Sequence, residues 1–261
     1  MPNRIPLQEC SETVNLSEGR KHKMDLTEAK VRLSEEGYCI LENQLPSSDA
    51  RCFDAQARAL MESEEDSIQK YERYLSMEDG LNQMPEIMHL CIHPPVIELA
   101  KSVVGEKFIL SNTVAMKWCR PGAQAGGLHA DWPLGAGVPE PWPLLPTGFV
   151  AFWMLSDFTQ KNGATAVVPF SHHSRRPPSR DDYPQEIPLV GKKGSVALFV
   201  NGLWHRSGAN TTSDQHRMAA SMFYTPEFLH RPRQGWPLVK RELYNKFPSR
   251  MQQLLARSVE I

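Results

Sequence analysis

The stretch GSVALFVNGLWHRSGANTTSDQHRMAASMFYTP, residues 194–226, holds two short apolar runs separated by a long irregular connection. Similar β-branched or aromatic runs come earlier, as FILSNTVAMKW (108–118), GFVAFWML (148–155) and GATAVVPF (163–170), with Gly, Pro, Asn and Asp between them. Such runs are typical of strands. Because helical patterns do not alternate with them, they favour a mainly antiparallel β architecture, a double-stranded β-helix of the jelly-roll, cupin-like kind, over a Rossmann-type fold.

Helical patterns flank these runs on both sides. DLTEAKVRLSEEGY begins with a capping Asp25 and ends near Gly37, the strand YCILEN follows, and further helical patterns continue to Gly105. We therefore expect a polar arm at 1–24 and one jelly-roll domain over 25–261. Within that domain we predict helical support at 25–105, a β core at about 106–226 and a C-terminal helix at 238–258. The helices should flank the β core, and the C-terminal helix should be interrupted near Pro248.

The overall composition excludes several classes of partner. Lysine plus arginine (29) nearly balances aspartate plus glutamate (30), so there is no general electrostatic reason to expect nucleic acid or an anionic membrane. The five cysteines form no CxxC pair, which argues against a disulfide framework or a structural zinc site. We find no apolar stretch that approaches the length of a membrane span. We expect a soluble, cytoplasmic protein with a small-molecule substrate, and the sequence does not indicate its oligomeric state.

The segment GGLHADWPLG supplies the first candidate metal ligands. His129 and Asp131 lie two residues apart, so on an extended segment both side chains point to the same face. A lone His-X-Asp pair is more often a capping or hydrogen-bonding feature. Here, however, His205 follows the strand GSVALFV, and a jelly roll brings such distant segments together. Two histidines and one carboxylate leave open positions on Fe(II) for cosubstrate and oxygen.

Two further residues suit a dicarboxylate cosubstrate. Arg217 opens the strand RMAASMFY twelve positions after His205, and a guanidinium binds a carboxylate through two parallel hydrogen bonds. Ser207 shares the strand face of His205 and can add a hydroxyl hydrogen bond. In the preceding strand, Asn112 lies on one face and Thr113 and Lys117 lie on the other, and the sequence leaves open which face points inward and whether the role is structural.

The arrangement resembles the phytanoyl-CoA dioxygenase family of iron and 2-oxoglutarate oxygenases from about residue 26 to 226. The motifs that carry the resemblance are LTEAKVRLSEEGYCILEN, GGLHAD, FWMLSDFTQKNGATAVVPFSHH and LWHRSGANTT. The resemblance implies that His129, Asp131 and His205 hold the iron, that Arg217 binds the side-chain carboxylate of 2-oxoglutarate and that Ser207 assists it. Phe152 stands where the family often has tryptophan, and we predict that it lines the cosubstrate site.

The sequence also departs from the family pattern at positions that bear on the substrate. The loop SDFTQKNG replaces an acidic form, and Phe170 replaces a glycine. The implied activity is Fe(II)-, O2- and 2-oxoglutarate-dependent hydroxylation of an aliphatic C–H bond, with release of succinate and CO2. Because Asp131 is present, hydroxylation is favoured over halogenation, while desaturation, cyclisation and epoxidation stay open. The sequence does not identify the substrate, and a lipid, an amino acid or a natural-product intermediate is compatible with it.

Three alternatives remain at this stage. A cupin-like binding protein would keep the fold without turnover, a zinc-dependent hydrolase would use the same three ligands, and a protein-modifying oxygenase would differ only in its substrate. His172 and His173 are interpreted as parts of a hydrogen-bonded loop, since adjacent strand histidines face opposite ways. The basic loop that contains Arg175, Arg176 and Arg180 is interpreted as solvated, and Trp132, Trp142 and Trp204 as either pocket lining or core.

Overall fold

A computed structural model describes residues 25–63, 69–70, 74–111, 114–131, 138–179, 181–182, 185–229, 237–255 and 258–260. The predicted polar arm at 1–24 lies outside these residues.

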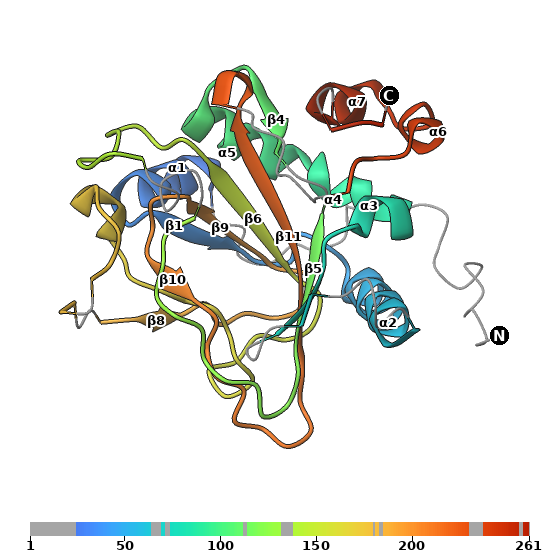
Figure 1. Cartoon of the computed structure of the whole chain (residues 1–261), viewed down its shortest axis with the longest axis horizontal. Coiled ribbons are helices and arrows are strands. Elements are labelled where there is room, and N and C mark those ends of the chain that lie inside the picture. Colours follow the sequence, from blue (N-terminus) through green and yellow to red (C-terminus); the bar gives the residue numbers. More distant parts are fainter. Residues whose placement is uncertain are drawn as a thin grey trace.

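The described strands form one large and one small antiparallel sheet (Figure 1). The large sheet has the order β1 (Tyr38–Leu41), β9 (Val196–Val200), β6 (Phe149–Met154), β11 (Arg217–Pro226), β5 (Ala115–Cys119), β3 (Leu75–Met77) and β2 (Gln69–Lys70), with β4 (Phe108–Leu110) paired to the far end of β11. The small sheet has the order β10 (His205–Arg206), β7 (Ala166–Val167) and β8 (Ile187–Pro188). The predicted double-stranded β-helix is therefore present.

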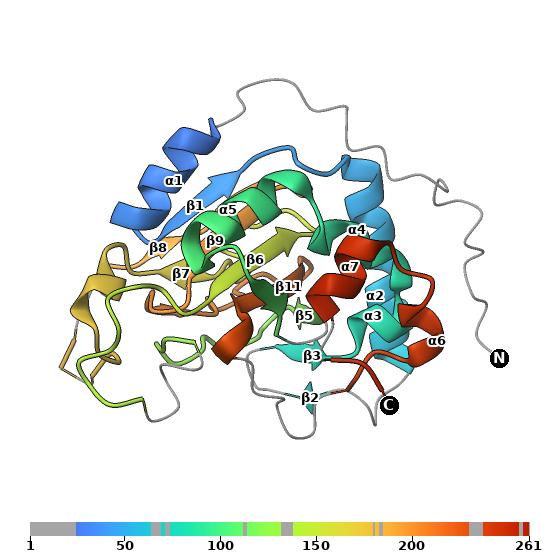
Figure 2. The same ribbon diagram turned by 90° about the horizontal axis from the view of Figure 1, so that it is seen from above.

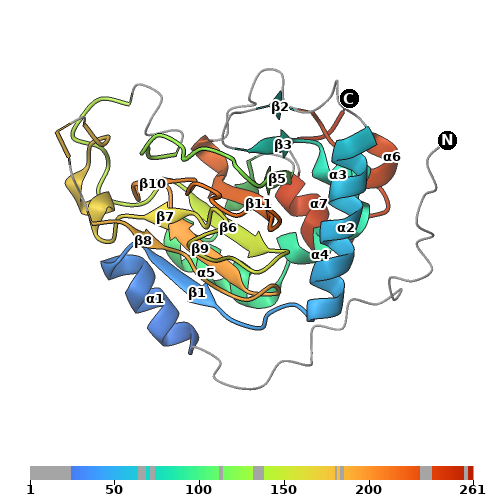
Figure 3. The ribbon, with the colours of Figure 1, turned by 90° about the horizontal axis from the view of Figure 1, so that it is seen from below.

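The two faces of the large sheet have different neighbours, because successive strand residues point to opposite sides. On the outer face, Trp153 and Leu198 pack against α1 (Leu26–Glu35) and α5 (Pro94–Val104), which lie together on that side in Figure 2. On the inner face, Phe152 and Phe199 pack against Val167 and Leu203, and β7, β8 and β10 lie over this side in Figure 3. The space between the two sheets is thus lined by the inner face.

The start of α1 and the end of α5 lie where the sequence patterns predict. The Asp25 side chain accepts a hydrogen bond from the Thr27 backbone N–H (3.1 Å), which caps α1. Gly105 ends α5 with φ 89°, a left-handed conformation that glycine adopts without a steric penalty. The remaining helices are α2 (Ser47–Ser63), α3 (Gly80–Gln83), α4 (Met88–Cys91), α6 (Arg241–Tyr244) and α7 (Ser249–Leu255), with 3-10 turns at Pro85–Ile87, Ser171–Ser174 and Glu227–Leu229.

Two details differ from the prediction. The region 25–105 is not only helical support, because β2 and β3 join the large sheet in addition to the expected β1. The run 108–118 is two strands, β4 and β5, which pair with opposite ends of β11. The expected interruption of the C-terminal helix near Pro248 is present, with α6 ending before this proline and α7 beginning directly after it.

Two further properties of the described residues bear on the expectations. No single described helix is long and apolar enough to cross a membrane. The neighbouring segments Pro85–Cys91 and Pro94–Val104, which are bent by 56° relative to each other, reach that length and apolar composition only when they are taken together. Cys39, Cys91 and Cys119 are buried free thiols, whereas Cys52 is disulfide-bonded. The cysteine pattern did not predict this bond.

Candidate active site

The segment 126–131 carries His129 and Asp131 and is called the HxD segment here. It lies beside the small sheet and pairs with His205 at the start of β10. The backbone of His129 forms an antiparallel bridge with His205, and the Asp131 N–H donates to the Asn201 carbonyl (3.0 Å). This pairing continues at the other end, where the Gly126 N–H donates to the Ser207 carbonyl (2.9 Å). Backbone bonds therefore fix the two segments that carry the candidate metal ligands.

The three candidate ligands converge. One ligand atom from each of His129, Asp131 and His205 lies within 4.8 Å of the others. The Asp131 Oδ1 atom is 3.9 Å from His129 Nε2 and 3.7 Å from His205 Nε2. The His205 side chain is only 9% exposed, whereas that of His129 is 49% exposed. The group therefore has a closed side at His205 and an open side at His129.

Hydrogen bonds orient both imidazoles for metal binding. The Nδ1 atom of His129 bonds the Gly127 carbonyl (3.0 Å), and that of His205 bonds the Leu203 carbonyl (2.9 Å). A carbonyl only accepts, so Nδ1 carries the proton and Nε2 presents its lone pair. Desolvation and the neighbouring His205 ring lower the pKa of His129 to about 4. The site thus favours neutral His129, which is the form that binds a metal.

Arg217 occupies the inner face at the start of β11. Arg217 is 1% exposed, and its Nε donates to the Gly163 carbonyl (3.1 Å). Its guanidinium carbon lies 5.7 Å from the centroid of the Phe152 ring and 5.4 Å from that of the Phe158 ring. Burial lowers the pKa of Arg217. The buried Nη1 has no hydrogen-bond partner, and no described carboxylate forms an ion pair with this residue. A buried guanidinium left in this way fits a carboxylate ligand.

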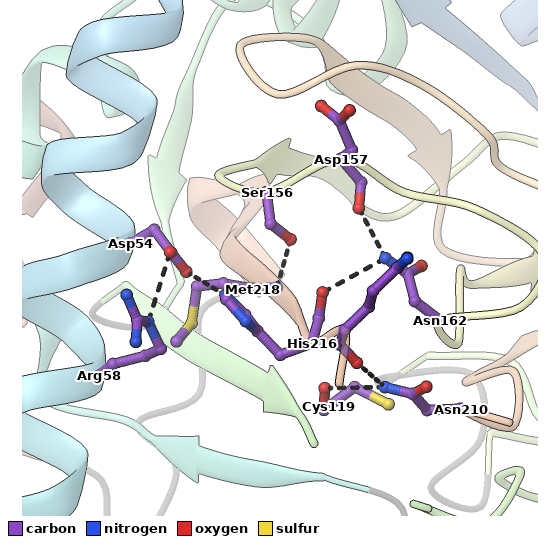
Figure 4. A network of polar contacts seen from close by, with 10 residues as sticks. Asp54, Arg58, Cys119, Ser156, Asp157, Asn162, Asn210, His216 and Met218 are labelled. Carbon is purple, nitrogen blue, oxygen red and sulfur yellow. Dashed lines mark hydrogen bonds and ion pairs between the residues drawn. The ribbon is translucent and has the colours of Figure 1, made fainter. Parts of the chain in front are cut away.

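A polar network holds the strand start that carries Arg217 (Figure 4). The buried Asn162 amide donates to the carbonyls of Asp157 (2.8 Å) and His216 (3.3 Å). His216 Nε2 in turn bonds Asp54 Oδ1 (2.9 Å) on α2. Asn210 donates to the Gln215 carbonyl (2.7 Å) on the opposite side of the same turn. Sequence reasoning did not identify these residues, and their only signal was their place in the turn-rich loops before each strand.

The other predicted cosubstrate residues differ in how they are placed. Phe152 lies on the inner face, with its ring against the Arg217 guanidinium. Ser207 follows β10 and is half-buried, and its carbonyl joins the backbone pairing of the HxD segment. Asn112 and Thr113 lie outside the described residues. The register of the strand after them is nevertheless fixed, because Lys117 pairs with Ala219, whose side chain belongs to the inner cluster.

The histidine pair and the basic loop serve the structure. His172 Nε2 bonds the Ser34 carbonyl (3.2 Å) and His173 Nε2 bonds the Glu35 carbonyl (3.1 Å), which confirms the hydrogen-bonded loop. The expectation that the two rings face opposite ways is wrong, because the 3-10 turn stacks them with centroids 3.9 Å apart. Arg176 forms two 2.8 Å bonds to Asp182, so it is not merely solvated.

The described tryptophans near the ligands fill core. Trp142 and Trp204 are buried in a small cluster with Ala130 and Val168. Ala130 and Trp204 alternate with His129 and His205 along their segments, so they point away from the ligands. Arg175 lies beside the same cluster, where its Nε donates to the Trp142 carbonyl (2.6 Å). Trp132 and Arg180 lie outside the described residues.

A double-stranded β-helix with a His-X-Asp pair and a distal histidine converging between its sheets defines a class of mononuclear metalloproteins. Within that class, the chain belongs to the phytanoyl-CoA dioxygenase (PhyH) family, whose model matches residues 33–219. The resemblance inferred from the motifs is thereby confirmed.

The named relatives agree with this assignment. The chain is 30% identical over 175 residues to "Dioxygenase af480" of Aspergillus fumigatus, covering 65% of this chain and 54% of the relative. It is 30% identical to the "Fe(II)/2-oxoglutarate-dependent dioxygenase nvfF" of Aspergillus novofumigatus, covering 51% and 45%. The chain thus spans about half the length of these curated relatives. The solved structure of the "non-heme alpha ketoglutarate dependent epimerase SnoN from nogalamycin biosynthesis" shares the fold, with a TM-score of 0.63, 20% identity and coverage of 77% and 82%.

Proposed function

We propose that this protein is an Fe(II)- and 2-oxoglutarate-dependent dioxygenase that hydroxylates an aliphatic C–H bond of a small molecule. One observation carries the proposal: the ligand atoms of His129, Asp131 and His205 lie within 4.8 Å of one another, on the side of the large sheet where Arg217 is buried with Nη1 unpaired. A binding site for a metal alone does not require this arginine. A site for a metal together with a dicarboxylate does.

Each residue has a separate task in this function. His129, Asp131 and His205 hold the iron from one side, which leaves positions for the cosubstrate and oxygen. The Arg217 guanidinium fixes the distal carboxylate of 2-oxoglutarate, and the aromatic rings of Phe152 and Phe158 beside it keep water from that end. Bound iron would supply the oxidative chemistry, in which one oxygen atom of O2 enters succinate as 2-oxoglutarate loses CO2 and the other enters the substrate C–H bond.

The open side at His129 is where we place the substrate. The ring of Phe199 lies 5.0 Å from that of His205 and covers that ring, whereas the His129 side chain is 49% exposed, so the substrate has access on the His129 side. The solved structure that shares the fold is of an epimerase from nogalamycin biosynthesis, and this supports a natural-product intermediate as substrate. An intact Asp131 supports hydroxylation over halogenation, because a halide needs the coordination position that the carboxylate fills.

The test uses purified protein with Fe(II) and 2-oxoglutarate under anaerobic conditions. We expect a weak visible charge-transfer band in the wild type, its loss in His129→Ala, and a rise of about tenfold or more in the 2-oxoglutarate concentration needed for the band in Arg217→Ala. His89→Ala, on α4, is the matched control and should behave as wild type. Stoichiometric iron binding without any band would overturn the proposal in favour of a zinc enzyme or a binding protein.

A further inference from the structure

Lys117 is a cation on the inner face that the proposed function has not yet used. It lies in the middle of β5, paired with Ala219 of β11 on one side and Ser76 of β3 on the other. Residues paired across an antiparallel ladder point to the same face, and Ala219 belongs to the inner cluster with Phe152. The Lys117 side chain therefore points between the sheets, although its neighbours Met116 and Trp118 are buried on the other side.

The surroundings of Lys117 place it beside the Arg217 anchor. Its Nζ lies 5.1 Å from the centroid of the Tyr74 ring. The register adds that Cys119, two residues along β5, pairs with Arg217. The ammonium thus faces the cavity that the metal and cosubstrate would share.

The protein itself does not neutralise this charge in the part of the chain that the structure describes. Among the described residues no carboxylate forms an ion pair with Lys117, whose Nζ lies over the face of the Tyr74 ring. The residue is half-buried, so water screens it less than it screens a surface lysine. A cation that is partly shielded from water and has no carboxylate of its own attracts an anionic ligand that enters the space between the sheets.

Counting formal charges shows what is missing once the proposed cofactors are bound. Fe(II), Arg217 and Lys117 bring four positive charges, and Asp131 and 2-oxoglutarate bring three negative ones. The metal and Arg217 already accommodate both carboxylates of the cosubstrate. The count therefore leaves one positive charge, that of Lys117, for a further ligand of the same cavity.

We propose that Lys117 binds a carboxylate of the primary substrate, so that this dioxygenase acts on an organic acid rather than on a neutral molecule. The proposal rests on the proposed function. The carboxylate accepts a charge-assisted hydrogen bond from the ammonium and thereby fixes the substrate beside the metal. Lys117 is in this sense a specificity-determining residue, and the carbon that reacts lies within reach of both the metal and the carboxylate.

The test uses benzoate as a probe and benzamide as its neutral counterpart. Their binding is measured by saturation-transfer NMR on protein loaded with Zn(II) and 2-oxoglutarate, which does not turn over, and again on protein with neither. In the wild type we expect benzoate to bind about tenfold or more tightly than benzamide. Lys117→Met should abolish this preference and Lys117→Arg should retain it. Lys107→Met, beside β4 at the far end of β11, is the matched control.

A second arm separates this proposal from the proposed function. The affinity for 2-oxoglutarate is measured by calorimetry in the same variants, and we expect Lys117→Met to change it by no more than about twofold. A large loss of 2-oxoglutarate affinity in Lys117→Met would make this lysine a cosubstrate contact and overturn the proposal, as would equal binding of benzoate and benzamide by the wild type. Absence of 2-oxoglutarate binding in the wild type would instead refute the proposed function.

Discussion

The backbones of His129 and His205 bond each other in both directions, with the N–H of His129 3.0 Å from the carbonyl of His205 and the reverse pair at 2.8 Å. This reciprocal pair holds their ring centroids 4.4 Å apart. The two residues are distant in sequence, so their approach depends on the pairing of two segments and not on local spacing. Because main-chain bonds set the geometry, side-chain substitutions should remove ligands without displacing the segments.

Removal of His205 should therefore abolish metal binding while the fold is kept. A metal present at 100 times its dissociation constant stabilises a protein by about 2.7 kcal/mol, and we expect His205→Ala to lose this stabilisation. Thermal unfolding with and without Zn(II) or anaerobic Fe(II) measures it. His89→Ala should keep the full metal-induced shift. If His205→Ala keeps the shift too, the metal binds elsewhere.

Replacement of Arg217 by methionine should separate stability from cosubstrate binding. The guanidinium is buried with Nη1 unpaired, and methionine removes the hydrogen bond from Nε to the Gly163 carbonyl, so the free energy of unfolding of the ligand-free protein should fall by no more than about 1–3 kcal/mol. The stabilisation by 2-oxoglutarate should disappear. Denaturant unfolding with and without 2-oxoglutarate tests both parts. A strongly destabilised ligand-free variant would show that the guanidinium serves mainly the fold.

The metal ligands could be predicted because their signal is local. His129 and Asp131 are two residues apart on an extended segment, and the alternation rule alone puts both side chains on one face. The same rule, applied to Trp204 beside His205, would have placed this tryptophan on the opposite face and in the core, where the structure has it. That information was present in the sequence and was not used.

The residues that support Arg217 could not be predicted in the same way. Asn162 and Asn210 act by donating to backbone carbonyls of the turn at 215–216, and such contacts depend on how two loops pack together. Neither asparagine has a spacing that distinguishes it from an ordinary turn residue. The short β2 and β3 were missed for a related reason, since two or three residues carry too little periodicity to indicate a strand.

The stability of the protein should fall in mild acid partly because of His172. Burial lowers the pKa of His172 below its usual value, so the folded protein keeps the ring neutral while the unfolded chain binds a proton near pH 6.5. The stability that comes from keeping His172 neutral is thus complete above about pH 6.5, and it is lost as the pH falls from 6.5 towards the lower pKa of the folded protein. Urea unfolding from pH 7.5 to 5 measures the slope. His172→Gln, which can still donate to the Ser34 carbonyl, should reduce the slope, and an unchanged slope would contradict the assignment.

Asn162 should control cosubstrate affinity from outside the ligand set. Its residue is 2% exposed, its amide nitrogen donates to the carbonyls of Asp157 and His216, and its oxygen accepts the Thr159 N–H (2.8 Å). Asn162→Ala leaves these buried groups without partners, which costs about 1–3 kcal/mol of stability. Because one of them immediately precedes Arg217, the loss should also weaken 2-oxoglutarate binding.

Comparison of the two affinities distinguishes this positioning role from general destabilisation. In Asn162→Ala, the dissociation constant for 2-oxoglutarate should rise several-fold while that for the metal stays the same, since the HxD segment is held by other backbone bonds. Asn245→Ala, at the exposed C-terminal end of α6, should change neither constant. Calorimetric titrations well below the unfolding temperature measure both. If the metal and cosubstrate affinities fall together, Asn162 supports the whole cavity and not the Arg217 strand in particular.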